Sequence, residues 1–194
     1  TARAMLAAAL DAEIGDSRLL LYAPTWRDGE ADPAVPTADE WLRIDAWLRD
    51  SDAMLVVRPH PNGVGDYAAG IAGSRRIHLL SSSRQSDLTP ILDAFQLLIT
   101  DYSSVAFDYS LTGGAILFIA PDEEDYTASR GLYEPYREFS GGREVRSWTG
   151  ILDQLEHFDT DPEWAAVVRA HSAALATRHF AFRDGRNTER VYFE

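Results

Sequence analysis

The stretch QLLITDYSSVAFDYSL, residues 96–111, decides the fold class of this chain. Gln96 to Thr100 is a short apolar run of the kind that forms a buried strand, and Val105 to Leu111 has the spacing of a helix. The polar residues Asp101 to Ser104 lie between the two. A strand, a polar turn and a helix in this order are the first part of a βαβ unit, which indicates a parallel sheet.

The same alternation extends over the rest of the chain. Four further runs rich in Leu, Ile and Val are predicted as strands: Arg18 to Tyr22, Ala53 to Val57, Arg76 to Leu80 and Ala115 to Ile119. Segments of helical period are found at Ala2 to Ile14, Glu40 to Arg49, Asp87 to Phe95, Trp148 to Phe158 and Pro162 to about His179. Gly29 to Thr37 is predicted as a long, mobile loop. The pattern is that of an α/β fold, a Rossmann-like parallel sheet with helices on both faces.

Length and composition restrict the class of protein. The 194 residues are 45% hydrophobic and 25% charged, which fits one compact domain over residues 1–194. Cysteine and lysine are both absent, so disulfides, thiolate chemistry and a phosphate-binding lysine are excluded. With a net charge of −13, binding to nucleic acid or to an anionic membrane surface is not expected.

The sequence also suggests where the chain works. No apolar run approaches the roughly 18 residues of a membrane-spanning helix, and the first residues lack the order of a signal peptide. Because cysteine is absent and nothing indicates an oxidising compartment, a cytoplasmic protein is expected. The sequence begins with Thr1 and enters a predicted helix at once, so we expect a fragment of a longer polypeptide.

Polar side chains follow each predicted strand. Ligands bind beyond the carboxyl ends of the strands in an open parallel sheet, so these residues are the first candidates for a site. They are Thr25 and Arg27, Arg58 and His60, Ser81 to Ser83, Asp101 with Ser103 and Ser104, and Asp122 with Glu123. Their gathering at one edge of the sheet predicts a nucleotide or phosphate site.

Ser103 and Ser104 precede a predicted helix and have two interpretations. A serine at the N-cap satisfies a free backbone N–H group and stabilises the helix by about 1 kcal/mol. Alternatively, the hydroxyls bind phosphate together with the free N–H groups and the positive end of the helix. Asp108, one turn further on, either belongs to a local network or accepts hydrogen bonds from ligand hydroxyls, such as those of a ribose or a polyol.

His60 lies between two prolines and close to Arg58, where the backbone is stiff. Its imidazole is either satisfied by backbone carbonyls or free to donate to a phosphate oxygen and move a proton.

The segment after the first strand also has two interpretations. In one, Trp26 packs in the core and Arg27 pairs with Asp28 or Asp32. In the other, Thr25 and Arg27 contact a diphosphate, to which arginine can donate two hydrogen bonds at once.

No metal site is predicted, because neither an HExxH motif nor a pair of carboxylates at ligand spacing is present. The acidic run Asp122 to Asp125 is instead predicted to begin a helix. A serine nucleophile is not supported, since no GxSxG motif surrounds Ser103 or Ser104. We expect no cofactor.

Four segments occur in order along the chain: LYAPTWRD at 21–28, RPHP at 58–61, LITDYSSVAFDY at 98–109 and DGRNTERV at 184–191. Together they resemble the CDP-glycerol glycerophosphotransferase family, which polymerises teichoic acid backbones. The third segment is far more specific than any single short motif, and the resemblance spans nearly the whole chain.

The resemblance implies a GT-B architecture of two Rossmann-like halves, and this chain is similar to the carboxyl-terminal, nucleotide-binding half. It implies CDP-glycerol or a related CDP-polyol as the donor, a polyol-phosphate polymer as the acceptor, and release of CMP. For the matching residues it implies that Ser103 and Ser104 hold the phosphates, that Asp108 takes a ligand hydroxyl, and that His60 contacts or protonates the departing phosphate. It assigns no residue to the cytidine.

The Trp-His-Gly motif of the family, which carries the supposed base that activates the acceptor, is absent from this sequence. It belongs to the amino-terminal half, which is therefore an expected partner. The chain alone is expected to bind donor without turnover, because phosphoryl transfer needs both nucleophile and leaving group in position. For the full-length enzyme the resemblance implies the cytoplasmic face of the cell membrane.

Two rival functions use the same fold: a nucleotide-sugar glycosyltransferase domain and a non-catalytic nucleotide-binding module. The first is disfavoured because only Gly113-Gly114 stands where such domains have a glycine-rich loop.

Overall fold

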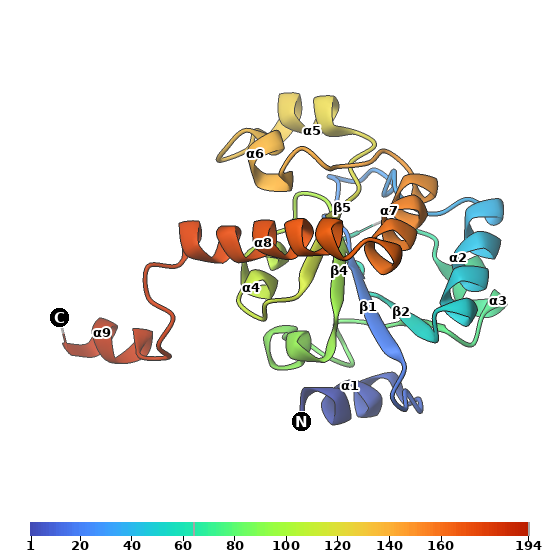
Figure 1. Ribbon diagram of the computed structural model, residues 1–194, viewed down its shortest axis with the longest axis horizontal. Helices are drawn as coiled ribbons and strands as arrows, with labels where there is room; N and C mark the ends of the chain where they lie inside the picture. Colours follow the sequence, from blue (N-terminus) through green and yellow to red (C-terminus); the bar gives the residue numbers. More distant parts are fainter. Residues whose placement is uncertain (64, 194) are drawn as a thin grey trace.

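The computed structural model describes residues 1–63 and 65–193, and these form one sheet of five parallel strands (Figure 1). The strands are β1 (Arg18–Ala23), β2 (Ala53–Val57), β3 (Ile77–Leu79), β4 (Leu97–Thr100) and β5 (Ala115–Phe118). Their order is β3-β2-β1-β4-β5, and each neighbouring pair is parallel. The predicted Rossmann-like sheet is confirmed, and its strand order reverses between β1 and β4.

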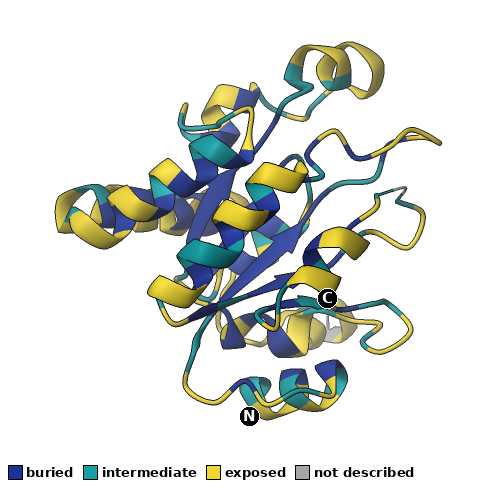
Figure 2. Ribbon diagram, turned by 90° about the vertical axis from the view of Figure 1, so that its right-hand side faces the viewer, coloured by how far each residue is buried: buried dark blue, intermediate teal, exposed yellow. Residues whose placement is uncertain are grey.

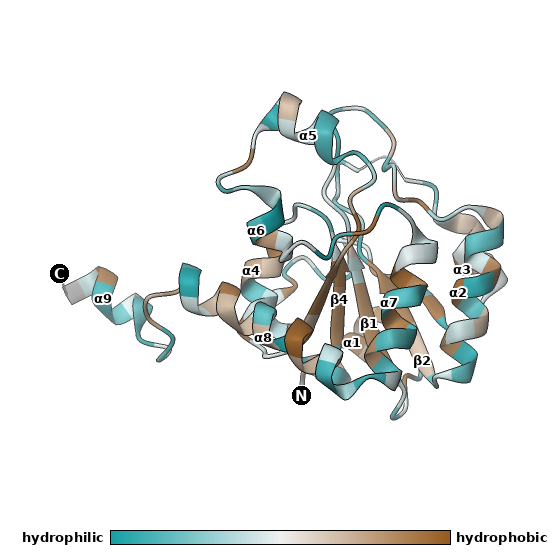
Figure 3. Cartoon of the chain, turned by 45° about the horizontal axis from the view of Figure 1, so that its top comes forward, coloured by the Kyte–Doolittle hydropathy of each residue, from teal (hydrophilic) through white to brown (hydrophobic). Residues whose placement is uncertain are grey.

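Both faces of the sheet are covered, as predicted. Leu20 and Tyr22 of β1 belong to one core cluster, whereas Leu19 and Leu21 belong to the other. Because successive side chains of a strand point to opposite faces, a strand that is apolar throughout must be covered on each side. Figure 2 shows buried strands between helices whose outer sides are exposed, and Figure 3 shows the most hydrophobic residues in the strands.

The helices form two layers with extensions at the edges. One face is covered by α2 (Ala38–Asp50), α3 (Ala68–Gly73) and α7 (Trp148–Thr160). The other is covered by α1 (Ala2–Leu10), the 3-10 helix η1 (Thr89–Ala94) and α4 (Val105–Ser110). Helix α8 (Pro162–His179) packs into both clusters. Beyond the carboxyl ends of the strands lie α5 (Glu123–Arg130) and α6 (Tyr136–Ser140), and α9 (Asn187–Phe193) projects away from the sheet (Figure 1). None of the helices in the described part of the chain is long and apolar enough to span a membrane.

Two helices have an end that differs from the prediction. In both, the capping residues decide where the helix begins or ends, and the spacing of apolar residues does not. Helix α2 begins two residues earlier than predicted, because Thr37 and Glu40 form a capping box in which each side chain accepts the backbone N–H of the other. Helix α1 ends before Asp11 and not at Ile14, because Asp11 adopts a left-handed conformation with a φ of 53°.

The predicted helix Asp87 to Phe95 is shorter and tighter than expected. Only the 3-10 helix η1 forms, with Pro90 in its first turn, where proline supplies no N–H group. The Asp87 carboxylate accepts the N–H of Thr89 at 2.9 Å, which favours a turn over a helix at this point.

The loop between β1 and α2, predicted to be long and mobile, is tied to the core. The buried carboxylate of Asp32 accepts hydrogen bonds from the hydroxyls of Tyr22, at 2.9 Å, and of Tyr67. Trp148 Nε1 donates to the carbonyl of Ala34 at 2.7 Å. These bonds fix the loop beside the carboxyl end of β1.

Candidate functional site

An open pocket of about 390 Å³ lies at the carboxyl ends of β1, β2 and β4. The strand order reverses here, and open parallel sheets bind their ligands at such a point. Five of the residues predicted for the site line the pocket: Arg58, His60, Ser103, Ser104 and Asp108. The other three form a separate hydrogen-bond network: Thr25, Arg27 and Asp101.

Arg58 supplies a buried positive charge to the pocket. It is 7% exposed, and its Nη1 and Nη2 donate to the carbonyls of Leu80, at 3.2 Å, and Ser86, at 3.4 Å. Burial lowers the pKa of its guanidinium, and within the described residues no carboxylate pairs with it to compensate. A buried cation whose partners are neutral carbonyls favours an anionic ligand, and arginine binds phosphate well in such a position.

His60 lies at the rim of the pocket, with an exposed side chain. Its Nδ1 accepts the backbone N–H of Asn62 at 3.1 Å. This hydrogen bond assigns the proton of the neutral ring to Nε2, which can donate to a ligand. The predicted alternative was an imidazole satisfied by backbone carbonyls, but within residues 1–63 and 65–193 the hydrogen bond of the ring is to a backbone N–H group.

The hydroxyls of Ser103 and Ser104 are largely left free by the helix that follows them. Ser104 is the N-cap residue of α4, but its side chain makes no capping hydrogen bond. Ser103 Oγ accepts the N–H of Val105 at 3.4 Å, at the long end for such a bond. Capping therefore accounts for little of what these serines do, and both line the pocket.

Asp108 faces the same pocket one turn along α4. Its pKa is raised by partial burial and by the nearby charge of Asp87. A carboxylate in this position can accept hydrogen bonds from ligand hydroxyls.

Part of the pocket wall was missed in the sequence. The segment after β3 contributes Ser82, which is one of the serines predicted to lie at this edge, and also Ser86, Asp87 and Thr89, which were not predicted. The run of serines directly after a predicted strand was the available signal, but nothing in the sequence indicated which of them face the ligand. Trp26 was also missed: it is half-buried, lies outside both core clusters, and stacks on His60 with 5.6 Å between ring centroids.

Arg27 binds two carboxylates that neither predicted interpretation named. Its Nε and Nη2 donate to the two carboxylate oxygens of Asp122 at 2.7 and 2.9 Å. Its Nη1 donates to Asp101 at 3.1 Å and to the carbonyl of Thr25 at 2.5 Å. The predicted pairing with Asp28 or Asp32 is wrong, because Asp28 instead pairs with Arg130 at 2.5 Å.

Asp101 is the second centre of this network. One of its oxygens accepts the backbone N–H and hydroxyl of Thr25, at 2.8 and 2.6 Å, and the backbone N–H of Tyr102, at 2.6 Å. The loop after β1, the loop after β4 and the start of α5 are thereby joined. Since Tyr102 precedes Ser103, the network sets the position of the serine turn.

Burial and pairing act in opposite directions on the charges of the network. Burial raises the pKa of Asp101, and the charge of Arg27 offsets this only in part. Burial also acts to raise the pKa of Asp122, but the hydrogen bonds and charge of Arg27 lower it overall. For Arg27 burial favours a lower pKa, and its two carboxylate partners raise it, so the guanidinium stays charged.

The acidic run after β5 begins a helix, as predicted: α5 starts at Glu123. Asp122 does not cap this helix with its side chain, because its carboxylate is engaged by Arg27. Over residues 1–63 and 65–193, no three His, Asp or Glu side chains lie in an arrangement that could hold a metal ion.

Comparison with known proteins identifies relatives over most of the chain. TarK of Staphylococcus aureus, a teichoic acid ribitol-phosphate polymerase, is 29% identical over 92% of this chain and 33% of its own length. The teichoic acid ribitol-phosphate primase of Bacillus spizizenii is 31% identical over 92% of this chain and 44% of its own length.

The fold is similar to that of the wall teichoic acid polymerase TagF, of which a variant has been solved after a soak with CDPG. The TM-score is 0.73 with 22% identity, and the match covers 98% of this chain and 45% of that one. This chain thus spans less than half the length of these relatives. The family model of CDP-glycerol:poly(glycerophosphate) glycerophosphotransferase matches residues 4–193, and the chain belongs to this family.

Proposed function

We propose that this chain binds the nucleotide of a CDP-polyol, CDP-glycerol first of all, in an enzyme that transfers the polyol phosphate to a growing teichoic acid or similar polymer. CMP is the product released. Membership of the family supports transfer of a polyol phosphate. The observation that carries the proposal is the pocket at the reversal of strand order, where a buried arginine and the hydroxyls of two serines converge.

Arg58 in the pocket can bind an anion although the chain as a whole is negatively charged. The net charge of −13 repels a diphosphate at long range. At physiological ionic strength, however, charges more than about 8 Å apart across water are largely screened. Arg58, which lines the pocket itself, is screened far less, so it can attract a phosphate group bound directly beside it, although the carboxylates of Asp87 and Asp108 line the same pocket.

The walls of the pocket correspond to the parts of such a donor. Arg58, Ser103 and Ser104 present donors to the diphosphate, in line with the preference of arginine and serine for phosphate oxygens. Asp108 presents an acceptor to a hydroxyl of the polyol or the ribose. The rest of the polar lining, formed by Ser82, Ser86, Asp87 and Thr89, is available to the cytidine.

The proposed reaction is an in-line phosphoryl transfer. The acceptor hydroxyl attacks the phosphorus that carries the polyol, and the bond between this phosphorus and the bridging oxygen of CMP breaks. The proton of the hydroxyl goes to a base on the acceptor side, and CMP leaves with the electron pair of the broken bond. His60 Nε2 donates a hydrogen bond to the departing oxygen, where negative charge develops.

Titration calorimetry on the chain tests the proposal. CDP-glycerol, CDP-ribitol, CMP and a UDP-sugar are titrated into the same preparation. We expect the CDP-polyols to bind most tightly, CMP less tightly because it lacks the second phosphate, and the UDP-sugar weakly. Equal affinity for the cytidine and uridine ligands would favour a nucleotide-sugar glycosyltransferase, and no binding at all would contradict a nucleotide site.

CDP-ribitol is included in this experiment because of the names of two relatives. TarK and the Bacillus spizizenii primase both act on ribitol phosphate, as their names state, although the family model is named for glycerophosphate. Whichever CDP-polyol binds more tightly identifies the donor. We further propose that the complete enzyme supplies the acceptor side from another part of the polypeptide and works at the cytoplasmic face of the membrane on its polymer.

A further inference from the structure

His60 is exposed, yet its ring is held from two sides. In its own turn, the backbone N–H of Asn62 donates to Nδ1 at 3.1 Å. On its face, the indole of Trp26 lies nearly parallel, with an interplanar angle of 17° and 5.6 Å between centroids. An exposed histidine without such contacts would sample several rotamers. The two contacts together hold this ring in one plane, and among the described residues Nε2 has no hydrogen-bond partner.

Trp26 is itself held by a second contact. The guanidinium of Arg130, at the end of α5, lies 4.8 Å from the centre of the indole, within the range of a cation–π contact. Arg130 is fixed in turn by an ion pair of 2.5 Å with Asp28. The space that Trp26 and His60 line together with Tyr67 is only about 10 Å³, so at most a single water fits there.

We propose that Trp26 is a positioning residue for His60. This role rests on the proposed function, in which His60 Nε2 donates to the departing phosphate. The indole keeps the imidazole in the plane in which Nε2 faces the pocket, and Arg130 with Asp28 keeps the indole in place. Trp26 touches neither donor nor acceptor and acts only through His60.

The stack is tested first by NMR on the chain. A ring stacked on an indole has its protons shifted upfield by the ring current of the indole. We expect the Cε1 and Cδ2 protons of His60 to move downfield in Trp26→Ala and to recover part of the shift in Trp26→Phe. We also expect the nitrogen signals to assign the proton of the neutral ring to Nε2 in the unaltered chain.

A second pair in the same molecule provides the matched control. His157 stacks on Trp164 with 4.7 Å between centroids and an angle of 15°, on helices α7 and α8. Trp164→Ala should therefore shift the protons of His157 and leave those of His60 unchanged. If Trp26→Ala leaves the protons of His60 where they are, the inference is overturned.

Steady-state kinetics of the complete polypeptide test whether the stacking of Trp26 on His60 affects kcat. Misplacement of a reacting group by about 1 Å can cost roughly 10²-fold, so we expect Trp26→Ala to lower kcat by about 10- to 100-fold with little change in the KM for donor. Trp26→Phe should recover most of the kcat. Added to His60→Ala, the Trp26→Ala change should lower kcat no further, because the group that it positions is gone.

The outcomes separate this inference from the proposed function. Normal kcat in Trp26→Ala, beside a strongly lowered kcat in His60→Ala, contradicts the positioning role alone. Normal kcat in His60→Ala contradicts the assigned role of His60 and with it the inference. A rise in KM for donor without a change in kcat would show that Trp26 contributes to binding rather than to the alignment of His60, and would also overturn the proposal.

Discussion

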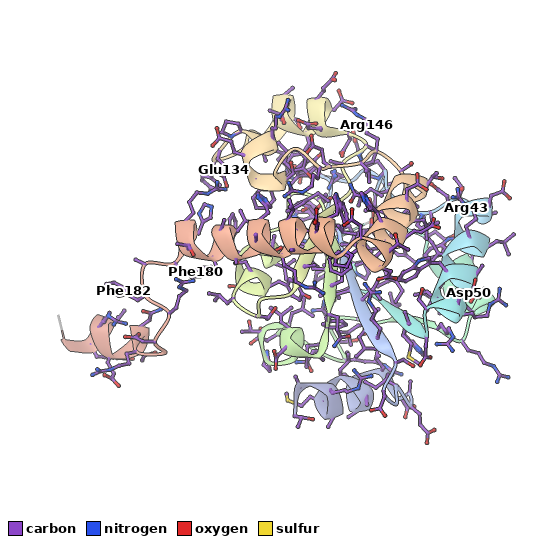
Figure 4. All side chains as sticks on the ribbon, viewed as in Figure 1. Arg43, Asp50, Glu134, Arg146, Phe180 and Phe182 are labelled. Carbon is purple, nitrogen blue, oxygen red and sulfur yellow. The ribbon has the colours of Figure 1, made fainter. Side chains whose placement is uncertain are left out.

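Arg58 is buried and its hydrogen-bond partners are neutral carbonyls, and the first prediction follows from this. Changing Arg58 to Met keeps much of the apolar stem and removes the charge. We expect the affinity for CDP to fall by about 10- to 100-fold, since a hydrogen bond to a charged group contributes roughly 1.5–3 kcal/mol. Calorimetry measures the loss. Arg43→Met is the control, because Arg43 on α2 is exposed, does not line the pocket and donates to Thr149 (Figure 4). Equal effects of the two changes would contradict the assignment.

Ser103 and Ser104 allow stability and binding to be separated. Neither makes a good capping bond, so we expect the double alanine variant to lose less than about 1 kcal/mol of unfolding free energy. Its affinity for CDP-glycerol should fall at least tenfold. Thr37→Ala is the control, because it breaks a true capping box on α2 and should cost about 1 kcal/mol with unchanged affinity. Denaturant unfolding and calorimetry on the same samples measure both. A double variant that behaves like Thr37→Ala would leave the serines without a phosphate role.

The raised pKa of Asp108 predicts a dependence of binding on pH. Burial and the charge of Asp87 raise this pKa above the ordinary 3.8, so the carboxyl takes up a proton at a higher pH than usual as the solution is acidified. A hydrogen bond that the carboxylate accepts from a ligand hydroxyl is therefore present at neutral pH and lost as pH falls through the raised value. CDP-glycerol suits the measurement because its diphosphate, esterified at both ends, has no ionisation near neutral pH.

Asp108→Asn isolates this effect from other titrating groups. The amide carries no charge, so affinity at pH 7 should be about tenfold weaker than that of the unaltered chain, in keeping with the loss of a charge-assisted hydrogen bond. As the pH is lowered, the two affinities should converge. A difference that is constant from neutral to acidic pH would show that the carboxylate of Asp108 does not bind the ligand.

At the scale of the elements, Arg27 joins the loops after β1 and β4 to the start of α5. Removal of Arg27 leaves the carboxylates of Asp101 and Asp122 without their cation, and Asp101 is fully buried. Breaking a buried pair on one side costs about 3–5 kcal/mol, so Arg27→Met should lower the free energy of unfolding by about this amount. Arg49→Met is the control, because the Arg49 side chain is 63% exposed and its i,i+4 ion pair with Asp45 contributes at most about 0.5 kcal/mol. Chemical denaturation of both variants gives the comparison, and a loss below 1 kcal/mol for Arg27→Met would contradict the role of the network.

The strands could be predicted from the sequence because each is a nearly continuous apolar run. A strand that is covered by helices on both faces needs apolar side chains at every position. All five were found within one or two residues at either end. The helix ends were less predictable, since a capping box at Thr37 or a left-handed turn at Asp11 involves a few polar atoms that the apolar period does not register. Helix α8 was predicted with both ends correct, because Pro162 opens it and a polar, charged stretch follows His179.

The site was predictable in part, and for a topological reason. Residues that directly follow parallel strands must meet at one edge, so Arg58 and Ser103 could be placed together without knowledge of any contact. The same argument could not tell which polar residues at that edge bind each other. Arg27 finds its carboxylates 74 and 95 residues further along the chain, and the sequence offered two acidic neighbours, Asp28 and Asp32, as equally good partners.

At the scale of the whole molecule, the proposed function makes the pocket one side of a reaction. Arg58, the serine turn and His60 all come from the carboxyl edge of the single sheet, and the pocket opens outward from it. In-line transfer places nucleophile and leaving group on opposite sides of the phosphorus. If this chain holds the nucleotide and the departing oxygen, the attacking hydroxyl has to be held on the other side of the pocket opening.

This geometry predicts binding without turnover for the 194-residue chain. A hydroxyl that arrives from solution lacks the effective concentration that an oriented partner supplies, which reaches about 10⁵ M or more in well-aligned systems. We therefore expect calorimetry to show CDP-glycerol bound to the chain, while release of CMP in the presence of a polyol-phosphate acceptor stays at the rate of the His60→Ala variant. The two rates are measured side by side by chromatography of CMP. Release of CMP that depends on acceptor and is abolished in His60→Ala would mean that the chain positions the nucleophile by itself, and the second side of the reaction would then have to lie among its own residues.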